Sequence, residues 1–188
     1  MKKTIVLFGL ASGTVSSAMM LATLPFHDRI GFDHGELIGY TTIVLSFLVV
    51  FFGVRSYREQ QPGGTLTFGR AFVVGLLITL ISCACYVATW EVIYYKLAPG
   101  FADKYAAYAV ERVKKSGASQ EKIDAMRREM AQFKVMYDKP LNKAAITFLE
   151  PFPIGLLVAV ISAGVLRRGR SGAAPSSRTA PASPATVR

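Results

Sequence analysis

The sequence predicts an all-α protein, a polytopic membrane bundle of four transmembrane helices with an amphipathic helical insertion between the third and the fourth. Each of four long apolar runs is close to or above the ~20 residues that a helix needs to cross a hydrocarbon core of ~30 Å. Glu91 and Glu150 are the only Asp, Glu, Lys or Arg residues inside these runs. The runs cover residues 4–26, 37–54, 71–95 and 144–166.

The composition agrees with a membrane protein. Of the 188 residues, 52% are hydrophobic and 18% are charged, whereas soluble domains are about 25% charged. The length fits one membrane domain, residues 1–168, and a tail, residues 169–188, whose Ala, Pro, Ser and Thr content predicts disorder. The net charge of +10 comes largely from cations that flank the apolar runs. This placement favours anionic lipid headgroups over nucleic acid as partners.

The first two apolar runs are predicted to form an antiparallel helical hairpin. The first run, residues 4–26, is too long for a cleaved signal peptide and is expected to remain as a helix that ends near Pro25. Residues 27–36 are the only connection to the second helix, which makes the two helices neighbours. Within this loop, Asp33 and Glu36 have the spacing of a capping box at the start of the second helix.

The polar segment 99–143 is predicted to hold two amphipathic helices that are separated near residues 114–119. An apolar stripe follows a three-four alternation along the second of them, as on a helix with one buried face. Three surfaces would bury the stripe: the membrane, the partner helix or another subunit. The stripe consists of Ile123, Met126, Met130, Phe133 and Tyr137.

The orientation follows from cations beside the short loops, which tend to stay in the cytoplasm. If all four helices cross the membrane, the arginines that are also predicted to contact lipid headgroups lie on the same side of it. Both termini are therefore expected in the cytoplasm, with an inner-membrane location and residues 99–143 outside. That segment is itself rich in Lys and Arg, but long segments translocate with less regard to charge. The predicted headgroup contacts are Arg55, Arg58, Arg70, Arg167 and Arg168.

Several short motifs resemble those of a known family. The sequence reads Phe-Gly-Val-Arg-Ser-Tyr-Arg at residues 52–58 and Phe-Gly-Arg-Ala-Phe at residues 68–72, and similar positions recur at Trp90, at residues 117–119 and at residues 150–151. On these residues the chain resembles the bacterial domain-of-unknown-function family 4199 over nearly its whole length up to residue 168. The resemblance implies a four-helix membrane protein and carries no catalytic residues, because the family has no established biochemical function.

Glu91 and Glu150 are the main candidates for a polar site, together with Trp90. Carboxylates inside a membrane often mark ion or proton paths, and two adjacent carboxylates would share a proton. The alternative is that each carboxylate is hydrated at the interface beside Lys96 or Lys143.

Other motifs have simpler explanations. His27, Asp28 and His34 are only weak metal candidates, because their spacing matches no zinc motif, and neither a metal nor another cofactor is expected. Small residues recur every four positions on three helices, which indicates packing inside the bundle or a homodimer contact. These ridges start at Gly9, Gly75 and Gly155.

The sequence therefore predicts a non-enzymatic integral protein of the inner membrane with a structural or interaction role. Its expected partners are lipids and either a second copy or another membrane protein. The alternative is a carrier of a small solute, ion or proton that uses Glu91 and Glu150. A membrane enzyme is the weakest interpretation, because no nucleophile–base pair or strong metal motif is found.

Overall fold

The computed structural model of the chain describes residues 1–167, with the side chains of residues 27–29 and 33 left out. The described part is helical and holds no strand, which confirms the all-α prediction. In chain order the α-helices are α1 (Lys2–Thr23), α2 (His27–Glu59), α3 (Phe68–Val92), α4 (Phe101–Lys115), α5 (Gln120–Tyr137), α6 (Pro140–Leu149) and α7 (Phe152–Leu166).

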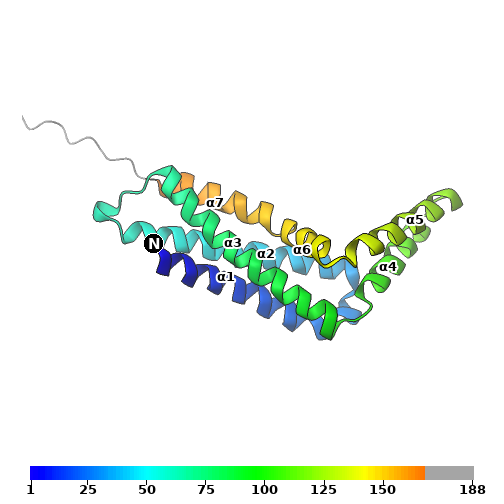
Figure 1. Ribbon diagram of the computed structural model, residues 1–188. Helices are drawn as coiled ribbons and strands as arrows, with labels where there is room; N and C mark the ends of the chain where they lie inside the picture. The colour runs from blue at the N-terminus through cyan, green and yellow to red at the C-terminus, as the bar shows by residue number, and fades with distance from the viewer. Residues whose placement is uncertain (168–188) are drawn as a thin grey trace, which may run out of the picture.

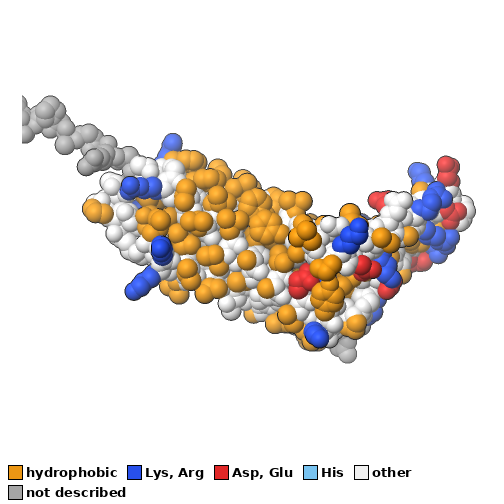
Figure 2. Space-filling model, viewed as in Figure 1, with side chains coloured by type: hydrophobic (Ala, Val, Ile, Leu, Met, Phe, Trp, Pro, Cys, Tyr) orange, Lys and Arg blue, Asp and Glu red, His pale blue; other side chains and the backbone are white. Residues whose placement is uncertain are grey.

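Four stretches are long and apolar enough to cross a membrane, as predicted. Together they form an elongated bundle, and Figure 2 shows hydrophobic side chains covering its length, with charged side chains gathered towards the two ends. An apolar band of this kind is what a lipid-facing surface requires. The four stretches are Lys2–Phe26, Ile30–Glu59, Phe68–Leu97 and Pro140–Leu166.

The helices pack through small residues. A Cβ on Gly9 would lie 2.7 Å from Ile81 Cβ, and one on Gly13 would lie 2.6 Å from Cys85 Cβ, so α1 and α3 touch along this ridge. A Cβ on Gly75 would lie 3.0 Å from Ala159 Cβ, where α3 meets α7. Close backbone approach is the main source of helix association in lipid. These ridges are therefore occupied inside the bundle.

The connection between the first two spans differs from the predicted loop. A 3-10 turn, Leu24–Phe26, leads directly into α2, which begins at His27 and is interrupted at Gly31 (φ 72°, ψ 167°). Glycine adopts this positive φ without the steric cost of a Cβ. Helical structure thus extends through the expected loop, and Glu36 lies within α2 rather than at its cap. The side chain of Asp33 lies outside the described residues.

The fourth span consists of two helices, α6 and α7, which meet at Glu150 and Pro151. Neither Pro151 nor Pro153 has a backbone N–H to donate to the preceding turn, so the helix breaks before Phe152. Pro153 then sits in the first turn of α7, where a proline is tolerated. The break places Glu150 at an irregular point of the span.

The insertion forms an antiparallel hairpin of α4 and α5 that projects from the end of the bundle opposite the N-terminus (Figure 1). The apolar stripe of α5 faces α4: Ile123 and Tyr137 are buried, and the ring centroid of Phe133 lies 6.1 Å from that of Tyr105. Of the three surfaces that would bury the stripe, the structure uses the partner helix.

Candidate functional site

A cavity of about 730 Å³ lies where the hairpin joins the bundle. Residues from α1 to α6 line it, because the ends of the spans diverge beneath α4 and α5. Its walls are mostly apolar, and nine of the lining side chains are aromatic. These are Phe32, Tyr40, Tyr86, Trp90, Phe101, Tyr105, Tyr108, Phe133 and Tyr137.

Two carboxylates, Glu36 and Glu150, belong to the cavity lining. The hydroxyl of Tyr86 donates a hydrogen bond to Glu150 Oε2 at 3.1 Å. Glu36 lies close enough to Glu150 for the two negative charges to repel each other. The acidic residue that shares the cavity with Glu150 is therefore Glu36 of α2, which had been predicted to be part of a helix cap.

Trp90 ties the bundle to the hairpin at the edge of the cavity. Its Nε1 donates a hydrogen bond of 2.7 Å to the hydroxyl of Tyr137, and its ring packs edge-on against Phe101, with centroids 4.9 Å apart. Burial raises the pKa of Tyr137, so this hydroxyl keeps its proton at neutral pH. Trp90 and Glu150 both belong to the lining of the cavity.

Glu91 lies in a different environment from Glu150. Its Oε2 is 3.2 Å from Lys143 Nζ, in an ion pair whose angles are not those of a hydrogen bond. The Lys143 side chain is fully buried and that of Glu91 is 26% exposed. The lysine also lies over two rings, 3.8 Å from the centroid of Tyr94 and 3.6 Å from that of Tyr95. Opposite charge and aromatic faces together compensate for the burial of this ammonium.

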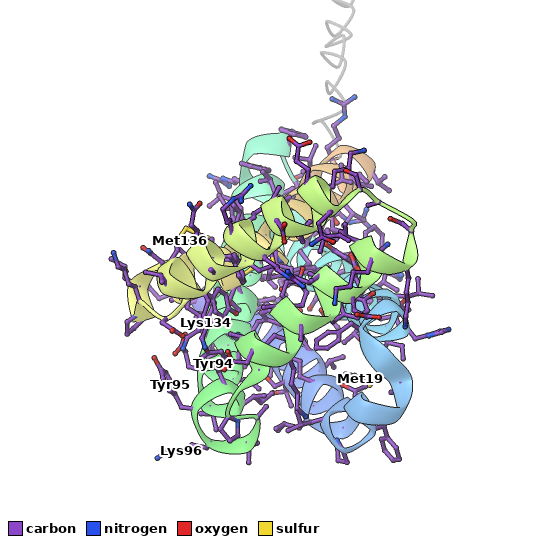
Figure 3. The ribbon with its side chains drawn as sticks, turned by 90° about the vertical axis from the view of Figure 1, so that its right-hand side faces the viewer. Met19, Tyr94, Tyr95, Lys96, Lys134 and Met136 are labelled. Carbon is purple, nitrogen blue, oxygen red and sulfur yellow. The ribbon has the colours of Figure 1, made fainter. Side chains whose placement is uncertain are left out.

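A π-helical turn, Ile93–Leu97, presents both tyrosines to Lys143. The turn is closed by a hydrogen bond of 2.7 Å from Ala98 N–H to the carbonyl of Ile93. Seen from the hairpin end, Tyr94 and Tyr95 lie on the opposite side of the molecule from Met19, which lines the cavity (Figure 3). Neither Lys143 nor the two tyrosines that contact it belong to the cavity lining.

The shared-proton arrangement of Glu91 and Glu150 is not what the structure has. Glu91 is level with Lys143, and Glu150 follows Lys143 by seven residues along the fourth span, which corresponds to about 10 Å of helix. Glu91 is also not among the residues that line the cavity. Of the alternative interpretation, in which each carboxylate is hydrated beside Lys96 or Lys143, the geometry supports the pairing of Glu91 with Lys143, whose side chain is buried.

One family model covers residues 7–168 of the chain, and its description is "Protein of unknown function (DUF4199)". The matched residues include most of the first span, the other three spans and the hairpin. The chain belongs to the DUF4199 family. No match to it was found among curated proteins or among solved structures. The function of this DUF4199 protein must therefore be argued from its own geometry.

Of the weak metal candidates of this DUF4199 protein, His34 is exposed and is not part of the cavity lining. The side chains of His27 and Asp28 lie outside the described residues. Among the residues that the structure does describe, no three His, Cys, Asp or Glu side chains gather as a metal site would require.

Four of the five arginines predicted to meet lipid headgroups are described, and they lie near the end of the bundle where the chain begins. Arg55 forms an ion pair of 2.9 Å with Glu59 there. Arg70 and Arg167 are exposed, and Arg58 is half-buried. Arg168 lies outside the described residues.

Proposed function

We propose that this protein is a multi-pass protein of the inner membrane with a non-catalytic binding role, in which the cavity under the hairpin holds a small amphipathic molecule. The observation that carries the proposal is the cavity itself. Its volume of about 730 Å³ falls within the ~300–1,000 Å³ of typical ligand pockets. Like such pockets, it combines apolar walls with a few polar groups, here Glu36, Glu150 and the Tyr86 hydroxyl.

The proposed orientation places both termini in the cytoplasm and the hairpin outside. The orientation is supported by five exposed cations that lie in or beside the ends of the four membrane segments that meet at one end of the bundle. They are Lys2, Lys3, Arg55, Arg70 and Arg167. Cations in short flanking segments are retained on the cytoplasmic side. The cavity would then open towards the outer face of the membrane.

A pair of glycine variants tests the binding role. A Cβ on Gly39, which lines the cavity, or on Gly164 of α7 would have no atom within 4 Å. Gly39→Leu should therefore fill part of the cavity without a clash, whereas Gly164→Leu should add a side chain elsewhere. Native mass spectrometry of the protein released from mild detergent should show a retained small molecule on the wild type and on Gly164→Leu. Equal retention by Gly39→Leu, or none by the wild type, would contradict the proposal.

A second candidate function, a carrier of protons or small ions, is supported by a group of buried hydroxyls next to the cavity. Ser12 Oγ lies 2.9 Å from Ser82 Oγ and donates to the carbonyl of Ser46 at 2.8 Å. Ser46 and Ser82 also line a small void beside Tyr86, which is the hydrogen-bond donor to Glu150. Such hydroxyls also hold membrane helices together, so the binding role is the leading proposal.

Reconstituted vesicles test the carrier function. With a pH-sensitive dye inside, the wild type should take up protons down an imposed gradient, and Glu150→Gln should abolish the uptake. Glu91→Gln should affect stability more than uptake, because Glu91 is held by Lys143. Vesicles with protein that acidify no faster than empty vesicles would remove this candidate.

A further inference from the structure

The charged residues of the cavity are unevenly distributed. Both acidic ones, Glu36 and Glu150, belong to the bundle, and both basic ones, Lys104 and Arg112, belong to α4 of the hairpin. Glu150 is level with Tyr86, seven residues or about 10 Å deeper along α3 than Ile93. The end of the cavity that lies within the membrane is therefore acidic.

The two carboxylates have no basic partner among the residues that the structure describes. Glu150 accepts one hydrogen bond, from Tyr86, and repels Glu36. The contrast with Glu91 is direct, since that carboxylate has Lys143 beside it. A positive charge between Glu36 and Glu150 would relieve their repulsion, and both carboxylates are exposed and therefore accessible to it.

The wall beside the carboxylates is aromatic. Tyr40, Tyr86 and Trp90 all line the cavity, and Trp90 follows Tyr86 by one helical turn on the same face of α3. Aromatic faces bind ammonium groups and, above all, quaternary ammonium groups. The same protein uses this chemistry for Lys143, whose ammonium lies over two tyrosine rings.

We propose that the ligand is an organic cation with an apolar body, an amine or quaternary ammonium amphiphile, whose charge lies between Glu36 and Glu150. This inference rests on the proposed binding role and specifies the class of ligand. The aromatic side chains Tyr86 and Trp90 would contact the cation, and the apolar lining residues Met19 and Ile38 would contact its body.

Two ions of the same shape and opposite charge test the proposal. Trp90 is the only tryptophan in the sequence, and it lines the cavity, so its fluorescence reports binding directly. The protein in nanodiscs of zwitterionic lipid is titrated with tetraphenylphosphonium and, separately, with tetraphenylborate. Empty nanodiscs correct for partitioning into lipid. We expect saturable quenching by the cation and at least a tenfold weaker response to the anion.

Three charge variants locate the site. Glu36→Gln and Glu150→Gln should each raise the Kd for tetraphenylphosphonium about tenfold, because each removes one attracting charge. Glu129→Gln removes the same charge from an exposed position on α5 and should leave the Kd unchanged. The two test positions lie on different helices, so a folding defect in one variant leaves the other informative.

The outcomes separate this inference from the binding role on which it rests. Equal or tighter binding of tetraphenylborate, or an unchanged Kd in both glutamine variants, would overturn the assignment of a cation. If Gly39→Leu still weakened binding of the probe, the binding role of the cavity would stand although the ligand is not a cation. If Gly39→Leu does not change the quenching, the probe binds outside the cavity. That result would overturn the cation assignment and the binding role together.

Discussion

The two halves of the bundle use glycine in opposite ways. Towards the N-terminal end, Gly9, Gly13 and Gly75 bring helices into direct contact, with almost no room for a Cβ. Towards the hairpin, Gly35 and Gly39 line the cavity and a Cβ would meet nothing within 4 Å. One half is closed by packing, whereas the other half stays open and is held together by a few polar and aromatic contacts.

The largest effect should come from the ion pair that joins the third and fourth spans in the open half. Lys143→Ala leaves Glu91 without its partner, and breaking a buried pair in this way costs about 3 kcal/mol or more of unfolding free energy. Thermal unfolding in detergent measures the loss.

A double variant distinguishes the charge from the packing of the lysine. Lys143→Met combined with Glu91→Leu removes both charges and should recover most of the stability, because paired charges are often replaceable by apolar side chains. A double variant as unstable as Lys143→Ala would show that the ion pair is not the main stabilising contact there.

The next largest effect should come from the closed half. In Gly155→Ala the new methyl group would contact Thr79 and would lie 2.8 Å from Phe47, so the variant should lose about 1–3 kcal/mol through overpacking. Gly164→Ala on the same helix meets no neighbour and should not be destabilised. Thermal unfolding of the two variants is measured in parallel. Equal unfolding temperatures would contradict the prediction.

A smaller effect is expected where the hairpin meets the bundle. Trp90→Phe keeps an aromatic ring but loses the donor to Tyr137, at a cost of about 1 kcal/mol. Tyr137→Phe loses the same bond from the other side. A double-mutant cycle of the two should show that the losses are not additive, whereas full additivity would mean that the hydrogen bond contributes nothing.

The smallest effect concerns pH. Lys134 contacts Asp103 across the hairpin, and this hydrogen bond raises the pKa of Lys134 above its ordinary value of 10.5. The folded state therefore binds this proton more tightly than the unfolded state. The resulting stability is present below pH 10.5 and is lost as the pH rises through the raised pKa. The unfolding free energy of Lys134→Met should depend less on pH than that of the wild type between neutral and strongly alkaline buffer. An identical pH dependence of the two proteins would contradict the prediction.

The spans and the hairpin could be predicted because their signals are local. Apolar runs of membrane length define α1 to α3, and the stripe from Ile123 to Tyr137 already shows one buried face on α5. The break of the fourth span follows from Pro151 and Pro153. In each case the residues that determine a helix or a helix break lie within a few turns of that element.

The cavity could not be predicted, because it depends on where six helices diverge. Glu36 looked like a capping residue, and only the extension of α2 through Gly31 makes it a lining residue. Lys143 looked like an interfacial cation at the start of an apolar run. Its complete burial depends on the π-helical turn of α3, more than 40 residues earlier, for which the pair Tyr94–Tyr95 was the only visible signal.

The break at Glu150 and Pro151 gives the fourth span a joint. Before it, α5 is joined to α6 by only Asp138 and Lys139, and the chain bends there, with Lys139 in an extended conformation (Figure 1). Both helices contribute to the lining of the cavity, and α5 is also half of the hairpin. A molecule that fills the cavity would press on α6 beside this joint. A displacement of α6 would be passed on to α5, so that ligand binding in the cavity would shift the hairpin.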